Sequence, residues 1–317
     1  MKTEEIKDHI FLAIQSFLKT PPVIIWGSGA TIPYGMASMS DLNKTIADSI
    51  PSFDGKSGNL EEELGKDCYI QFLPEIRKII WKTIKEKDEK IIPLILKNPS
   101  DFKGIYTMIK KCIDAEPKVA NIITTNYDRI LEFVVSYYGI SFTDGFNGRV
   151  LSTFNVNLFQ EKSIVNLIKV HGSINWGQDS NDVRYMDCTD EISPTIIPPG
   201  KNKYREAYHM PYRELIHKAD EIISHANSFF VVGFGFNDEH LTPKVKEKAE
   251  KGTPIVLITF QITDTAYKEL QKAQKYILIE HEINNQTKVL IKNNDKEESY
   301  TIDGEYWQLN KFMEEIL

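Results

Sequence analysis

Three short polar segments in this chain of 317 residues each follow a run of β-branched and apolar residues. The segments are Gly27-Ser28-Gly29-Ala30-Thr31, Thr124-Thr125-Asn126-Tyr127-Asp128 and His171-Gly172-Ser173. Runs of this kind are typical of strands that are buried on both faces of a parallel sheet. In an open α/β sheet the carboxyl ends of such strands meet at one crevice. The pattern therefore predicts an α/β fold with a Rossmann-like parallel sheet, and a nucleotide site with a reactive group at that crevice.

Composition excludes several classes of protein. The hydrophobic content of 41% is ordinary for a globular domain, and the net charge of −7 argues against a general binder of nucleic acid. The three scattered cysteines offer no disulfide framework and indicate a reducing compartment. The N-terminus lacks a signal-peptide pattern, and no apolar run approaches the roughly 18 residues that a membrane helix needs. We expect a cytoplasmic protein that binds neither nucleic acid nor membrane.

The periodicity of apolar residues outlines the domain organisation. It predicts helices over residues 4–18, 40–50, 128–138 and 307–317. Residues 51–117 change in character and are predicted to form a helical insertion, since isoleucines recur there at helical spacing. Residues 263–317 are predicted to be a C-terminal appendage, with a hairpin around the alternating stretch 288–292 and the closing helix. The whole chain, 1–317, is interpreted as one domain.

The residues of the polar segments and their order resemble those of the sirtuin family, whose NAD-binding domain has a glycine turn of the form GAGxS, then TQNxD, then HG. A fourth segment, Val231–Asp238, lies where that family has a late strand ending in a phosphate-binding glycine turn. The resemblance spans about residues 20 to 262. Each motif alone is weak, but four in this order are fairly specific. The resemblance implies a sirtuin-like fold with NAD+ as its substrate.

Two departures from the family pattern indicate a branch. Deacylating sirtuins carry two cysteine pairs that hold a structural zinc after the HG histidine, whereas only Cys188 lies between His171 and Gly233 here. Deacylases also follow the glycine turn with a GIPDFR-like flap, and this chain continues from Ile32-Pro33 into Tyr34–Ser38. The chain is therefore more similar to the sirtuin-like NAD hydrolases of bacterial antiphage defence. No zinc and no cofactor beyond NAD+ as substrate are expected.

The resemblance implies residues that bind the rest of NAD+. Backbone N–H groups in a glycine turn can approach a pyrophosphate where a Cβ would obstruct it. The residues expected in this role are Gly27, Ser28, Gly29, Ala30 and Thr31, the last through its hydroxyl group. Gly233 and Gly235 are expected near the phosphates and Thr259 near the adenosine ribose. The alternatives are a tight strand-to-helix turn at Gly27 and simple packing at the later glycines.

The second segment is expected to carry the reaction. Cleaving the nicotinamide–ribose bond develops positive charge on the ribose, which a nearby carbonyl group can stabilise while a positioned water captures it. By resemblance, Asn126 holds the ribose or that water and Asp128 orients the nicotinamide amide. Thr125 stands where the family has a glutamine that contacts the ribose. The alternative for Asn126 is a cap on the helix that follows.

His171 is the candidate general base, because an imidazole can accept a proton from a ribose hydroxyl or water near neutral pH. The alternative is a structural hydrogen-bonding histidine. His240 follows acidic residues that suit a helix N-terminus as well as they suit a metal.

The predicted function is hydrolysis of NAD+ to nicotinamide and ADP-ribose, in an antiphage effector that depletes NAD+ when activated. A free enzyme of this kind would be toxic, so we expect gating by a homo-oligomer or by a regulatory partner such as a defence-system ATPase. An NAD-dependent protein deacylase and a non-catalytic sensor of NAD or ADP-ribose stay open as alternatives.

Overall fold

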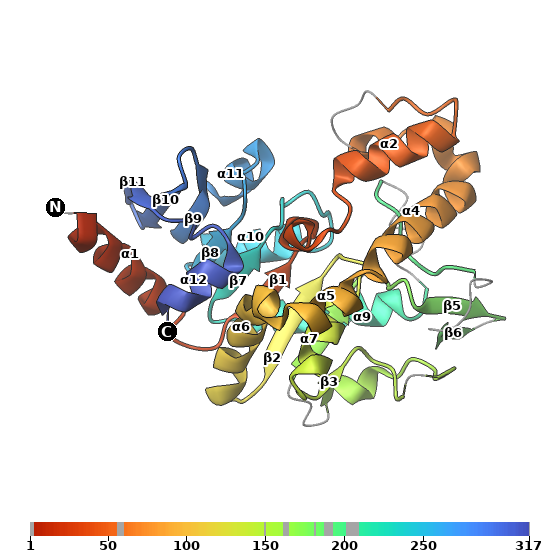
Figure 1. The fold of residues 1–317 in the computed structure, drawn as a ribbon, viewed down its shortest axis with the longest axis horizontal. Coiled ribbons are helices and arrows are strands. Elements are labelled where there is room, and N and C mark those ends of the chain that lie inside the picture. The colour runs from red at the N-terminus through yellow and green to blue at the C-terminus, as the bar shows by residue number, and fades with distance from the viewer. Residues whose placement is uncertain are drawn as a thin grey trace.

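The fold, a mixed α/β architecture, places one long sheet between helices (Figure 1). It was obtained as a computed structural model, which describes residues 3–55, 60–148, 150–160, 165–180, 182–186, 193–200 and 209–316. Cys188 lies outside these ranges. Within them, no helix is long and apolar enough to cross a membrane.

The sheet has nine strands in the described part of the chain, in the order β11-β10-β9-β8-β7-β1-β2-β4-β3. Its strands are β1 (Val23–Trp26), β2 (Ala120–Thr124), β3 (Phe142–Thr143), β4 (Val165–Lys169), β7 (Phe229–Val232), β8 (Ile255–Ile258), β9 (Lys275–Glu282), β10 (Gln286–Asn293) and β11 (Lys296–Asp303). All neighbours from β3 to β9 pair in parallel, and β9, β10 and β11 pair antiparallel. The predicted Rossmann-like parallel sheet is confirmed.

Helices cover both faces of this sheet. Every residue of β1, β7 and β8 is buried, as expected for parallel strands between two helical layers. Ile24 and Trp26 face one core, while Val23 and Ile25 face the other. The first core is closed by α1 (Thr3–Phe17), α6 (Lys103–Asp114), α7 (Ile130–Tyr137) and α12 (Leu309–Ile316), and the second by α9 (Tyr212–Ser224), α10 (Thr242–Glu250) and α11 (Asp264–Leu270).

The chain between β1 and β2 forms a group of helices, the first of which lie beside the carboxyl ends of the strands, at the upper right of Figure 1. It contains α2 (Met39–Ser49), α3 (Leu60–Leu64), α4 (Leu73–Asp88) and α5 (Ile91–Lys97), and α6 then returns to the sheet. Ile76, Ile80 and Ile84 are buried one turn apart along α4, which is the spacing read from the sequence. Ser38 caps α2 reciprocally with Asp41.

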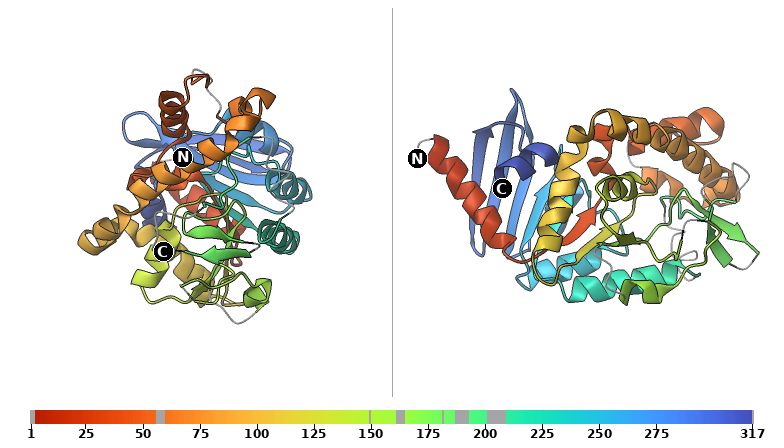
Figure 2. Two further views of the ribbon diagram at one scale, coloured as in Figure 1. Left: turned by 90° about the vertical axis from the view of Figure 1, so that its right-hand side faces the viewer. Right: turned by 60° about the horizontal axis from the view of Figure 1, so that its bottom comes forward.

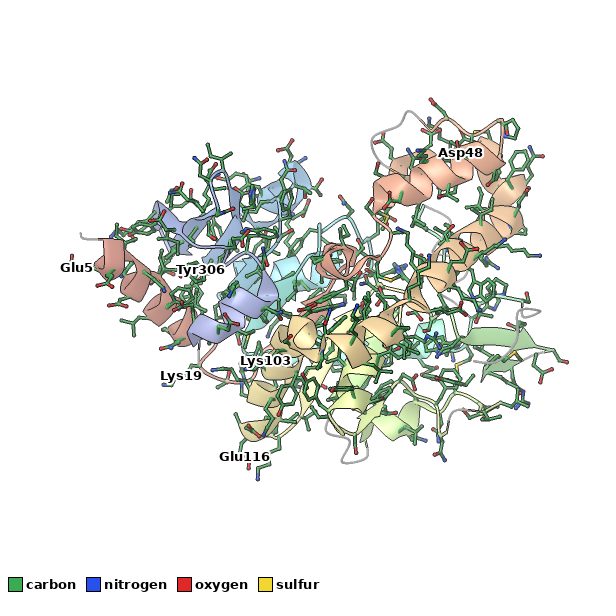
Figure 3. All side chains as sticks on the ribbon, in the orientation of Figure 1. Glu5, Lys19, Asp48, Lys103, Glu116 and Tyr306 are labelled. Carbon is green, nitrogen blue, oxygen red and sulfur yellow. The ribbon has the colours of Figure 1, made fainter. Side chains whose placement is uncertain are left out.

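The C-terminal residues extend the central sheet. β9 adds parallel to β8, so the hairpin predicted around residues 288–292 is the middle of a three-stranded meander, visible in the right-hand view of Figure 2. Tyr306, labelled in Figure 3, follows this meander, and its ring lies 5.3 Å from that of Phe11 on α1. Lys7 on the same helix binds Glu315 of α12 at 2.8 Å. The two ends of the chain are thus packed together.

Two glycine turns touch each other through their backbones, because β1 and β7 are neighbours in the sheet. Gly27 N donates to Val232 O and Gly29 N donates to Gly233 O, both at 2.9 Å. A Cβ on Gly27 would lie 2.4 Å from Gly233 O, and a Cβ on Gly233 would lie 2.0 Å from Ala30 N. Gly233 also has a φ of +57°, which favours glycine. Only glycines allow the two turns to meet this closely.

We expect Gly27→Ala to destabilise the protein by about 1–3 kcal/mol or more, because the new methyl group would separate the two turns. Gly235→Ala is the matched control: its φ is not in the left-handed region, and its Cβ would meet only the end of the Asn237 side chain, at 3.2 Å. Chemical denaturation followed by circular dichroism measures both. Equal free energies of unfolding for the two variants would show that the contact between the turns is not tight.

Candidate functional site

A pocket of about 760 Å³ opens at the carboxyl ends of β1, β2, β4, β7 and β8. Of the residues that the sequence indicated, the pocket is lined by Ser28, Gly29, Thr31, Thr125, Asn126, Asp128, His171, Gly233, Gly235 and Thr259. Gly27 and Ala30 lie behind this lining, in the backbone contact between the turns. Four distant motifs are therefore brought to one cavity, whose volume is within the range of small-molecule sites.

The first turn does not lead directly into an α-helix. Two short 3-10 helices follow Gly27, η1 (Ser28–Ala30) and η2 (Ile32–Tyr34), and α2 begins only at Met39. Thr31 is buried, and its hydroxyl group donates to Ser28 O at 3.1 Å. Because the hydroxyl hydrogen of Thr31 is bonded within the turn, this hydroxyl group stabilises the turn.

The Asn126 side chain is fixed by its amide nitrogen. Nδ2 donates to Gly27 O at 3.1 Å, and the backbone N–H donates to Thr124 Oγ1 at 3.0 Å. Thr124 in turn donates to Trp26 O at 2.8 Å, which ties the end of β2 to the end of β1. Asn126 Oδ1 is buried and has no hydrogen-bond partner among the described residues. An acceptor left in this state is one that a water or a ligand hydroxyl can satisfy.

The capping alternative for Asn126 is wrong. The residue before α7 is Arg129, which makes no side-chain cap, and the first turn of this helix is instead served by Asp128, whose Oδ1 accepts from Ile130 N at 3.3 Å. Because the Asn126 amide points to the turn after β1, it contributes nothing to the start of α7.

His171 forms a buried pair with Asp238. Both side chains are only 4% exposed, and His171 Nε2 lies 3.1 Å from Asp238 Oδ2. The other carboxylate oxygen accepts from the backbone N–H groups of His240, at 3.0 Å, and Leu241, at 2.8 Å. The carboxylate is thus held at the start of α10 and faces the end of β4. The sequence analysis quoted Asp238 in the fourth motif but missed this role, since 67 residues separate the pair.

Asp128 lines the pocket, and its carboxyl group forms no ion pair among the described residues. Burial raises the pKa of this carboxyl group to about 7, and the Lys169 ammonium group opposes the rise. Lys169 Nζ donates to Asp128 O at 2.5 Å and to Glu132 Oε1 at 2.7 Å. Lys169 is the last residue of β4 and precedes His171 by two residues.

Helix α4 supports both reactive loops from outside. Trp81 Nε1 donates to Ile174 O at 2.6 Å, just after the His171 segment. Asp88 accepts from Arg129 N at 2.6 Å and from Arg129 Nε at 2.9 Å, just after Asp128. Trp81 and Asp88 are seven residues apart and so share one face of the helix. Ile84, between them, lines the pocket together with Leu60 and Glu61 of α3.

Residues that can bind a metal ion are not clustered in the described part of the chain. It contains no group of three His, Cys, Asp or Glu residues that could hold a metal ion. Cys68 and Cys112 are free thiols. The segment after His171 forms a small hairpin, β5 (Trp176–Asp179) and β6 (Asp182–Tyr185).

The chain is similar to several solved structures and to one family model. Similar solved structures include Sir2Tm bound to a propionylated peptide (14% identity, 85% of this chain and 90% of that chain, TM-score 0.45) and a Sir2 homologue in complex with NAD (17%, 81% and 82%, 0.46). A structure described under the mechanism and regulation of Sir2 enzymes covers 98% of both chains at 14% identity, with a TM-score of 0.46. No curated protein matched the sequence. The model of the SIR2-like domain matches residues 120–279, about half of the chain, and the protein therefore belongs to the SIR2-like domain family.

Proposed function

We propose that this protein hydrolyses NAD+ to nicotinamide and ADP-ribose. The observation that carries the proposal is the Asn126 side chain, whose nitrogen is anchored while its buried oxygen has no hydrogen-bond partner among the described residues. His171 lines the same pocket and is paired with a carboxylate, as a general base would be. A fixed acceptor and a proton acceptor are the two groups that water attack on a ribose needs.

The pocket suggests how the substrate lies. Ser28, Gly29 and Gly233 bring backbone close to the cavity and suit the pyrophosphate. Asn126 and Asp128 lie at the nicotinamide end, and Thr259 lies near the adenosine ribose. The contact between the turns supports this placement because it lines the cavity with backbone that carries no bulky side chain. Gly27 and Ala30 act behind it, by holding the turn in shape.

In the proposed reaction the bond between the nicotinamide nitrogen and ribose C1′ breaks, and its electron pair neutralises the ring nitrogen. The positive charge that develops on the ribose is stabilised by Asn126 Oδ1, which also positions a water molecule. The water oxygen forms the new bond to C1′ and its proton passes to His171. Asp238 stabilises the resulting imidazolium group. One NAD+ and one water give nicotinamide, ADP-ribose and a proton.

The pocket wall bears on the choice between NAD+ hydrolysis and protein deacylation. The segment after the glycine turn, with Met36, Ala37 and Ser38 in the pocket wall, lacks the Asp-Phe-Arg sequence of the deacylase flap, which favours hydrolysis over deacylation. We place the protein among antiphage effectors that deplete NAD+. Such an enzyme requires gating by a homo-oligomer or by a partner such as a defence-system ATPase.

We expect the purified protein, in its activated assembly, to convert NAD+ to nicotinamide and ADP-ribose without any peptide. Chromatography of the products after incubation with NAD+, with and without an acetyl-lysine peptide, makes the measurement. Formation of products only with the peptide would identify a deacylase. Binding of NAD+ without any product in every assembly state would identify a sensor instead.

We expect Asn126→Ala and His171→Ala each to lower the rate of NAD+ cleavage by at least about a hundredfold, because each removes a positioning or proton-accepting group. Both proteins should be folded at the assay temperature, which a melting curve checks. Near-normal turnover of His171→Ala would mean that this histidine is structural. Loss of fold in Asn126→Ala would mean that its anchor between β1 and β2 is its main role.

We expect Asp238→Asn to lower kcat by about tenfold to a hundredfold with little change in KM, because it removes the negative charge that lies 3.1 Å from His171 Nε2 and would stabilise an imidazolium group there. An asparagine keeps an acceptor for the His240 and Leu241 N–H groups, so α10 should be unaffected. Glu239→Gln, the exposed neighbour, is the control with native kcat. An equal loss of kcat in the two variants would show that Asp238 has no specific role in the reaction.

A further inference from the structure

Five charged side chains are buried together beside the pocket. They are Asp88 from α4, Asp128 and Arg129 from the loop after β2, Glu132 from α7 and Lys169 from β4, and none is more than 8% exposed. Charged side chains are seldom buried to this extent, because removing them from water is costly even when they are paired. Four separate segments of the chain contribute to this cluster.

The contacts divide the cluster into two ion pairs around Asp128. Arg129 Nη2 lies 2.7 Å from Asp88 Oδ2, and Lys169 Nζ lies 2.7 Å from Glu132 Oε1. Lys169 also reaches the backbone oxygen of Asp128. Among the described residues, the Asp128 carboxyl group itself forms no ion pair, and it accepts from Ile130 N–H at 3.3 Å. It is thus surrounded by charges that are already engaged with one another.

We propose that Asp88 and Lys169 are positioning residues for Asp128, and that their opposite charges control the charge state in which its carboxyl group meets the nicotinamide ring. The proposal rests on the proposed function only in placing Asp128 beside the nicotinamide ring. It adds a role for two residues, on α4 and β4, that do not belong to the catalytic motifs.

The electrostatics support this geometry. Burial raises the pKa of Asp128 to about 7; the positive charge of Lys169 lowers it, and the negative charges of Asp88 and Glu132 raise it. Arg129 neutralises part of the Asp88 charge. Across the pocket, His171 is paired with Asp238. Removal of Lys169 or of Asp88 should therefore shift the Asp128 pKa in opposite directions.

The protonation state of Asp128 would affect cleavage directly. The nicotinamide ring is positively charged in NAD+ and neutral once it leaves. An ionised Asp128 favours the charged ring of the substrate, while a neutral Asp128 can donate a hydrogen bond to the nicotinamide carbonyl without stabilising that charge. Since only interactions that favour the transition state over the substrate accelerate a reaction, kcat should fall as the pH rises through about 7.

The first measurement needs no activity. Carboxyl carbons of aspartate are labelled with 13C in the full-length protein, and the Asp128 signal is identified by its loss in Asp128→Asn. We expect a titration midpoint near 7 in the native protein. Lys169→Met should raise this midpoint by about one unit or more, and Asp88→Asn should lower it by about one unit or more, each at least a tenfold change in proton affinity.

The second measurement is the pH profile of kcat for NAD+ cleavage. Its alkaline limb should move to higher pH in Lys169→Met and to lower pH in Asp88→Asn, and Lys169→Arg should restore the native limb because the charge is kept. A merely structural role would lower kcat without moving the limb. Lys110→Met, which removes an exposed lysine from its pair with Asp114 on α6, is the matched control with native midpoint and limb.

Asp88→Asn weakens the buried pair with Arg129 and can prevent folding, since breaking a buried ion pair is strongly destabilising. Glu132→Gln is the second variant: it keeps an oxygen for Lys169 and removes one negative charge, so it should also lower the Asp128 midpoint. Midpoints that are unchanged, or that move in the same direction in the lysine and carboxylate variants, would overturn the proposal. If the midpoints shift as expected but the protein cleaves no NAD+, the proposed function is overturned instead.

Discussion

The contact between two glycine turns is the constraint on which the site depends. Because β1 and β7 are neighbours, the turns that follow them must pass at backbone distance, with Gly29 N bonded to Gly233 O. This contact fixes where the Gly27 carbonyl group points, and that carbonyl group anchors the Asn126 amide. A third strand, β2, is thereby tied to the same centre. The glycines thus hold Asn126 in place at the pocket.

Helix α4 gives the site its second support. It holds the loop after His171 through Trp81 and the loop after Asp128 through Asp88, while Ile84 lies in the pocket wall between them. A segment inserted between two strands therefore forms part of the pocket wall. Because one helix face contacts both loops, a displacement of α4 would alter both at once.

Local sequence patterns predicted the strands, the glycine turns and the positions of Asn126 and His171, because each depends on a few consecutive residues. Pairs between distant segments had no such signal: Asp238 with His171, and Asp88 with Arg129. The capping role considered for Asn126 was wrong, because its side-chain amide binds the Gly27 carbonyl group of a distant turn and not the start of the helix that follows. Likewise, the pairing of β9 with β8 depends on the whole sheet. The sequence therefore predicted a C-terminal hairpin but not its position at the edge of the central sheet.

The central claim is that Asn126 presents a fixed oxygen to the nicotinamide ribose. A crystal structure of the His171→Ala protein with bound NAD+ tests it most directly, because the substrate should survive in that variant. The account predicts a ribose hydroxyl or a ribose-bound water within hydrogen-bond distance of Asn126 Oδ1, with the pyrophosphate against the turns of Gly29 and Gly233. NAD+ bound with its ribose away from Asn126 would contradict the account.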